Sequence, residues 1–187
     1  MNLRQFVVIM TDTQRLDMVS CYEDVGIKTP NIDSLAADGI KFSKAYTVQP
    51  VCGPARSAIF TGQYPCINGS YTNCIAPGLN VKSIGERLSD KGVLTGYIGK
   101  WHLDGGDYFG LGTAPRGWDA STWYDMRNYL DELSETDRVK SRKTSTMDHE
   151  DIPAEFTFAH RCATRAIDFI RRHANEDFFL VVSFDEP

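Results

Sequence analysis

The chain has 187 residues, of which 42% are hydrophobic and 24% charged, and this composition excludes the collagen-like, coiled-coil and intrinsically disordered classes. Twenty basic against 25 acidic residues give a formal net charge of −5, which argues against a nucleic-acid-binding protein. No apolar run approaches the ~18 residues of a membrane span, and the run at 6–10 is too short for a signal-peptide core. We therefore expect a cytoplasmic protein with no membrane or nucleic-acid partner.

Short apolar runs and helix start and stop signals alternate along the chain. In chain order they predict a strand at 6–10 that is buried on both faces, a helix at 30–38, a strand at 40–46, helices at 54–61 and 83–91, a strand at 93–98, helices at 119–133 and 153–174, and a strand at 178–184. The glycine-rich residues 99–117 predict a loop, and the polar residues 134–151 predict a solvated insertion.

Strands that alternate with helices predict an α/β fold with a mostly parallel sheet and helices on both faces. In such folds, ligands bind beyond the carboxyl ends of the strands. That rule directs attention to three places: residues 11–12, 99–102 and 185–186.

The most specific pattern of the chain lies at residues 51–62, which read V-C-G-P-A-R-S-A-I-F-T-G. Cys52 is expected just before a helix N-terminus, where free backbone N–H groups and the helix dipole favour an anion. Arg56 lies one turn further on and could point back toward the same anion as a planar fork. The alternative is a buried cysteine with a surface arginine.

The pattern C-x-P-x-R followed by T-G resembles the signature of type I sulfatases of the alkaline-phosphatase-like superfamily. Further matches follow the family's order: an acid after the first strand at Asp12, F-x-x-x-Y at 42–46, GKWHL at 99–103, and the strand at 179–187. The resemblance implies that residues 1–187, with the insertion at 134–151, are the N-terminal portion of a longer catalytic domain. It also implies that this piece alone has little or no activity.

The family's chemistry implies that Cys52 is oxidised to Cα-formylglycine by a formylglycine-generating or anaerobic maturation enzyme. The aldehyde hydrates, one hydroxyl activated by a divalent cation attacks sulfur, and the second hydroxyl then expels sulfate. By resemblance, the catalytic residues are Cys52, Arg56, Lys100 and His102, the substrate-binding residues are Lys100, His102 and Arg15, and the metal ligands are Asp12, Thr13 and Cys52. Lys100 and His102 are two residues apart, so both can face one anion.

The implied cofactor is Ca²⁺ or Mg²⁺, with Mn²⁺ as a further option, because these hard cations take oxygen ligands. The family often has two acids where this chain has Asp12-Thr13, so one carboxylate is missing, and Gln14 is an alternative neutral ligand. The implied substrate is a small aryl or carbohydrate sulfate. Two alternatives stay open: a phosphonate or phosphate ester hydrolase of the same superfamily, and a non-catalytic anion- or sugar-binding relative. The sequence makes no prediction of oligomeric state.

Overall fold

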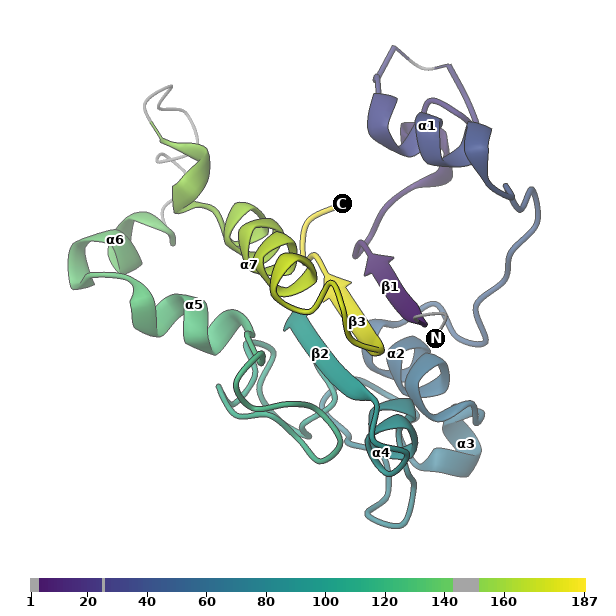
Figure 1. Cartoon of the computed structure of the whole chain (residues 1–187), viewed down its shortest axis with the longest axis vertical. Helices are drawn as coiled ribbons and strands as arrows, with labels where there is room; N and C mark the ends of the chain where they lie inside the picture. The colour runs from purple at the N-terminus through teal and green to yellow at the C-terminus, as the bar shows by residue number, and fades with distance from the viewer. Residues whose placement is uncertain (1–3, 25, 143–151) are drawn as a thin grey trace.

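A three-stranded parallel sheet forms the centre of the computed structural model, which describes residues 4–24, 26–142 and 152–187 (Figure 1). Its strands are β1 (Gln5–Met10), β2 (Leu94–Gly99) and β3 (Phe178–Ser183), in the order β1-β3-β2. Phe178 lies opposite both Gln5 and Leu94, so the three strands are in step. Their carboxyl ends therefore meet at one edge of the sheet, as the sequence predicts.

Alternation along β3 divides the apolar core into two layers, one on each face of the sheet. Phe178, Leu180 and Val182 join the cluster beneath α7 (Phe158–Arg172), whereas Val181 joins an aromatic cluster on the opposite face. Helix α7 fits its layer because its buried residues recur at helical spacing, at Phe158, Cys162, Ala166 and Phe169. The predicted helix at 153–174 is thus confirmed in its main part, after a 3-10 turn at Ala154–Phe156.

The opposite face is covered by short helices: α2 (Cys52–Thr61), α3 (Pro65–Asn68) and α4 (Ile84–Ser89). Phe60 of α2 packs edge-on against Tyr97 of β2, and Trp101 and Trp118 complete this layer. Ser83 caps α4 in a capping box with Glu86, which places the start of this helix where the sequence predicts it. Helices therefore cover both faces, and the predicted α/β class is confirmed.

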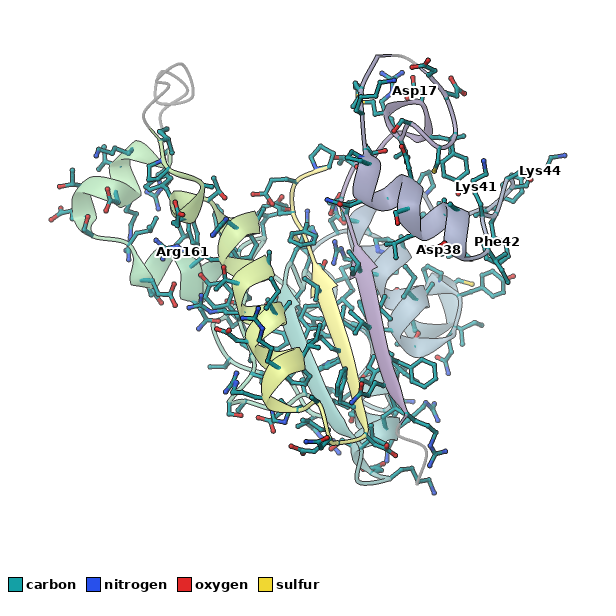
Figure 2. The ribbon with its side chains drawn as sticks, turned by 45° about the horizontal axis from the view of Figure 1, so that its top comes forward. Asp17, Asp38, Lys41, Phe42, Lys44 and Arg161 are labelled. Carbon is teal, nitrogen blue, oxygen red and sulfur yellow. The ribbon has the colours of Figure 1, made fainter. Side chains whose placement is uncertain are left out.

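The prediction that the first strand is buried on both faces is wrong in this structure. Strand β1 lies at an edge of the sheet, and Phe6 and Ile9 are 63% and 61% exposed. Helix α1 (Pro30–Asp38) lies apart from the sheet on an arm that also carries the 3-10 turn η1 (Leu16–Met18) (Figure 1). Figure 2 shows Phe42 and Lys44 pointing outward from this arm.

Three predicted elements differ from the observed ones. Residues 40–46 are not a strand, since no strand lies beside them to share a hydrogen-bond ladder among the described residues. The helix predicted at 119–133 shortens to α5 (Met126–Glu132), because Asp125 starts it with a capping box to Asn128. The polar segment contains α6 (Glu135–Lys140), and its residues 143–151 lie outside the described residues. Within the described ranges, no helix combines the length and apolar character needed to cross a membrane.

Candidate active site

The carboxyl edge of the sheet gathers three charged residues, one just beyond each strand. Asp12 follows β1, Lys100 follows β2 and Asp185 follows β3. The Lys100 ammonium lies 2.7 Å from Asp12 Oδ2 and 2.8 Å from Asp185 Oδ1. Lys100 and Asp12 are buried, so both charges depend on these partners rather than on water.

Arg56 extends from α2 into the same cluster and is only 3% exposed. One of its terminal nitrogens donates to the Lys100 carbonyl at 2.7 Å and to Ser183 Oγ at 2.8 Å. The other donates to Asp12 Oδ2 at 3.2 Å. The guanidinium is thus bonded to the ends of all three strands, and its predicted role as a fork toward an anion stays a prediction. Its observed position braces α2 against the sheet and orients Asp12.

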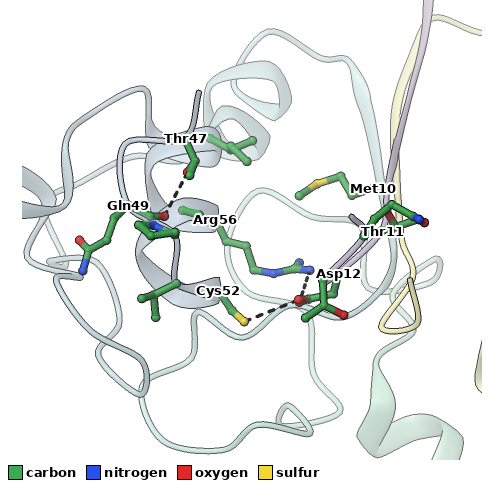
Figure 3. A pocket seen from close by; sticks show the side chains of 13 residues that line it. Met10, Thr11, Asp12, Thr47, Gln49, Cys52 and Arg56 are labelled. Carbon is green, nitrogen blue, oxygen red and sulfur yellow. Dashed lines mark hydrogen bonds and ion pairs between the residues drawn. The ribbon is translucent and has the colours of Figure 1, made fainter. Parts of the chain in front are cut away.

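Cys52 is the first residue of α2, and its Sγ lies 3.7 Å from Asp12 Oδ1 (Figure 3). Sulfur and carboxylate face an open pocket of about 770 Å³, which Thr13 and Gln49 also line. The cysteine is half-buried, so its side chain is reachable from this pocket. The alternative of a fully buried structural cysteine therefore does not apply to Cys52.

The first N–H groups of this helix have protein partners in part, and the anion expected beside them stays a prediction. The Gly53 N–H donates to Asn73 Oδ1 at 2.8 Å, and Pro54 has no N–H. The Ala55 N–H donates to the Val51 carbonyl in the first turn of the helix. Side-chain cations, not a row of helix amides, are thus the main positive groups near Cys52.

Opposing effects set the protonation states in the cluster. Burial works to raise the pKa of Asp12, but hydrogen bonds and charges from Lys100 and Arg56 outweigh it and hold this pKa below its ordinary value. Burial works to lower the pKa of Lys100, but bonds to Asp12, Asp185 and Tyr108 raise it overall. The site therefore holds a carboxylate and an ammonium at neutral pH.

His102 is also at this edge, and its geometry is unusual. It is 6% exposed, its backbone φ is +60°, and its Nδ1 has no hydrogen-bond partner among the described residues. A non-glycine residue with this φ stores strain, which concentrates at functional sites. Burial, together with the charges of Lys100 and Arg56, lowers the pKa of His102. The ring is therefore a neutral group with an unused nitrogen.

The remaining predicted residues are less involved in the cluster. Thr13 lines the pocket and has a φ of +55°, which is rare for a β-branched residue. Arg15 is exposed and forms an ion pair with Asp17, so the structure does not bring it to Asp12. The roles predicted for Thr13 and Arg15 stay predictions.

Sequence reasoning missed Tyr108, whose hydroxyl lies 3.0 Å from Lys100 Nζ and 2.7 Å from Asp185 Oδ1. No local signal identifies this residue, because it lies in a loop without helix or strand. It also missed Asn73 as the partner of Gly53. Asp185 lies where the strand-end rule pointed, although the sequence assigned it no role.

The described residues do not by themselves fit a complete divalent-cation site. Hard cations take six or more oxygen ligands, and Asp12 is the one carboxylate beside Cys52 in the pocket lining. Its Oδ2 is already bonded to Arg56 and Lys100. No group of three or more His, Cys, Asp or Glu side chains in the described ranges could hold a metal ion. Asp12 Oδ1 and Thr13 would contribute part of a site at most.

Together, the fold and the site define a class: an α/β protein with a cysteine, a carboxylate, a buried lysine and a neutral histidine at the carboxyl edge of a parallel sheet. Comparison with known proteins places this class in a family. The family model described as Sulfatase matches residues 4–187. The chain therefore belongs to the sulfatase family, within the alkaline-phosphatase-like superfamily.

Individual relatives agree with this assignment. The chain is 49% identical over 189 residues to the uncharacterized sulfatase YidJ of Escherichia coli (strain K12), covering 97% of the chain and 38% of the relative. It is 29% identical over 153 residues to an N-acetylglucosamine-6-O-sulfatase of Bacteroides thetaiotaomicron, covering 78% of the chain and 27% of the relative. A solved YidJ sulfatase structure from Bacteroides fragilis superposes with a TM-score of 0.73 at 26% identity, covering 98% of the chain and 44% of that structure. The chain thus spans less than half the length of these relatives.

Proposed function

We propose that the protein hydrolyses a sulfate ester and that residue 52, as formylglycine, is its nucleophile. The observation that carries this proposal is the position of Cys52: its Sγ lies 3.7 Å from Asp12 Oδ1 in an open pocket, in a chain of the sulfatase family. Formylglycine supplies a hydrated aldehyde whose hydroxyl can attack sulfur and which is restored when sulfate leaves.

The chain's own residues would then position and stabilise charge. Asp12 accepts hydrogen bonds at a fixed place beside residue 52, because Arg56 and Lys100 hold its other oxygen. The Lys100 ammonium offsets charge on the transferred sulfuryl group. His102 is neutral, and its Nδ1 has no partner among the described residues, so the ring can donate or accept one hydrogen bond that holds the leaving oxygen or the nucleophile in place.

The reaction consumes one water molecule per ester: the sulfur–oxygen bond to the leaving group breaks, and an alcohol and sulfate are released. We propose an aryl or carbohydrate sulfate as substrate. The carbohydrate option draws support from the N-acetylglucosamine-6-O-sulfatase among the relatives. A bound Ca²⁺, Mg²⁺ or Mn²⁺ would lower the pKa of a hydroxyl and offset negative charge, and Asp12 and Thr13 are its candidate ligands in this chain. Further ligands would be required, so we expect residues 1–187 alone to have little activity.

The test is a turnover assay on protein made from its complete reading frame together with a formylglycine-generating enzyme. We expect hydrolysis of a chromogenic aryl sulfate or a sulfated glucosamine, and loss of this activity in Cys52→Ala. Cys66→Ala is the matched control, because Cys66 is exposed and lies outside the site. Retained turnover in Cys52→Ala would refute the proposal. Faster hydrolysis of a phosphonate monoester than of any sulfate ester would instead favour the superfamily's other chemistry.

A further inference from the structure

Within residues 4–24, 26–142 and 152–187, each of the three donors of the Lys100 ammonium has an oxygen partner. A lysine ammonium carries three N–H groups, and three oxygens surround it: Asp12 Oδ2 at 2.7 Å, Asp185 Oδ1 at 2.8 Å and Tyr108 Oη at 3.0 Å. The side chain is 5% exposed. An incoming oxyanion can therefore bond to Lys100 only if one of these three oxygens gives up its place.

Tyr108 is the partner that is easiest to displace. Its hydroxyl is neutral, its distance is the longest of the three, and the residue is 43% exposed. The hydroxyl also donates to Asp185 Oδ1 at 2.7 Å, a bond that does not require contact with Lys100. Asp12 is held by its charge and by a second bond to Arg56, and Asp185 is held by its charge opposite the ammonium. In the contacts with Asp12 and Asp185 both partners are charged, so the ammonium attracts them by an ion–ion interaction that the neutral Tyr108 hydroxyl lacks.

The surroundings of Tyr108 also permit movement. The residue lies in a long connection after β2 that contains neither helix nor strand, and Gly106 and Gly110 lie two residues to either side of it. Its ring meets His102 edge-on at a centroid distance of 5.2 Å. The Lys100 ammonium lies 4.3 Å from the centre of the same ring. Tyr108 thus covers two of the residues that the proposed reaction uses, Lys100 and His102.

We propose that Tyr108 is a displaceable cover on Lys100, and that its hydroxyl competes with the substrate's oxyanion for the third donor of the ammonium. This inference rests on the proposed function for its meaning, since it concerns how the site admits a sulfate group. The Tyr108 hydroxyl accepts the third hydrogen bond of Lys100 when no oxyanion is bound, and it is displaced when a tetrahedral oxyanion offers a charged oxygen to the ammonium. Tyr108 accordingly weakens the binding of every oxyanion at Lys100, product sulfate included.

The experiment measures the affinity for inorganic sulfate by calorimetry, at constant ionic strength, on protein made from its complete reading frame. Tyr108→Phe removes the hydroxyl and keeps the ring. We expect the dissociation constant for sulfate to fall about two- to tenfold, the effect of one hydrogen bond. Tyr64→Phe is the matched control, because Tyr64 is exposed and does not line the pocket beside Cys52, and it should leave the constant unchanged.

A double-mutant cycle shows whether the gain acts through Lys100. In the Lys100→Ala background, Tyr108→Phe should no longer strengthen sulfate binding. An unchanged or higher dissociation constant for Tyr108→Phe overturns the proposal, since the hydroxyl would then be inert or would itself bind the anion. An equal gain in the Lys100→Ala background also overturns it. If Tyr108→Phe does not fold, Tyr108→His keeps an aromatic ring without the phenol hydroxyl and is measured in its place.

Sulfate affinity needs no turnover, so the two proposals fail separately. A protein that hydrolyses no sulfate ester but gains sulfate affinity in Tyr108→Phe supports the cover and contradicts the proposed function. A protein that hydrolyses sulfate esters but shows no gain supports the function and contradicts the cover.

Discussion

Replacement of Lys100 by methionine tests the physical basis of the site most fully. Methionine keeps much of the apolar stem and removes the ammonium that lies between Asp12 and Asp185. The two carboxylates, whose side chains are 9% and 17% exposed, then lose a shared cation. Removal of one partner from a buried ion pair costs about 3–5 kcal/mol in the free energy of unfolding. Arg56 still contacts Asp12 at 3.2 Å, so we expect the free energy of unfolding at pH 7 to fall by about 3 kcal/mol.

The loss should depend on pH in a defined direction. In the parent protein the folded-state pKa of Asp12 lies below its ordinary value, so its stabilising contribution is present at pH 7 and disappears as the pH falls through that depressed pKa. In Lys100→Met the hydrogen bond and charge of Lys100 are gone, while burial still raises the pKa of Asp12. The difference between variant and parent should therefore be largest near pH 7 and shrink below about pH 4.

Urea unfolding followed by tryptophan fluorescence measures this difference, with EDTA present so that no metal ion competes for Asp12. The matched control is Lys82→Met. Lys82 also lies 2.7 Å from a carboxylate, that of Asp90, but both side chains are about half exposed, so we expect no measurable loss. Equal losses in the two variants, or a loss for Lys100→Met that grows as the pH falls, would refute the reasoning.

Three further predictions concern the parts that hold the site. Gly99→Ala should unfold the protein or lower its free energy of unfolding in urea by about 4 kcal/mol or more. The φ of Gly99 is +115°, and a Cβ there would lie 1.9 Å from the Ser183 carbonyl oxygen. A stable variant would contradict the observed approach of β2 to β3. Phe169→Ala should lower the free energy of unfolding by about 3–5 kcal/mol, since Phe169 is fully buried. Ile167→Ala, on the exposed side of α7, is the control, and similar losses in the two variants would contradict the assigned core. The folded protein loses stability between pH 7 and pH 5, because the unfolded state takes up a proton on His102 that the lowered pKa keeps off the folded state. His102→Gln should make this pH-dependent loss smaller. An unchanged pH profile in thermal unfolding would argue against a buried neutral ring.

The carboxyl edge of the sheet was predictable from the sequence, and the bonds within it were not. Hydrophobic runs fix β1, β2 and β3 closely, and parallel connectivity then brings Asp12, Lys100 and the residues after β3 to one edge. Bond partners depend on side-chain directions and loop paths that no local pattern encodes. Tyr108 is the main example, since nothing in residues 99–117 indicates that its hydroxyl reaches Lys100 and Asp185.

Arg56 and the strand at 40–46 show two other limits. Arg56 lies one turn into a helix, and this position indicated that its side chain faces the site. Its hydrogen-bond partners, the Lys100 carbonyl and Ser183, lie far away in sequence and could not be predicted in this way. Residues 40–46 have a strand-like composition, yet a strand needs a neighbour with free hydrogen-bonding groups. The shortened α5 is different, because Asp is a preferred N-cap residue and Asp125 before an apolar residue would have placed the start of this helix correctly.

The chemical state of residue 52 tests the central claim most directly. Mass spectrometry of the tryptic peptide from Ala45 to Arg56 distinguishes an aldehyde from a thiol, and it should be applied to protein made from its complete reading frame with a maturation enzyme. The proposed function predicts an aldehyde at residue 52 in protein that hydrolyses sulfate esters, with turnover proportional to the modified fraction. Full activity in protein whose Cys52 remains an unmodified thiol would contradict it.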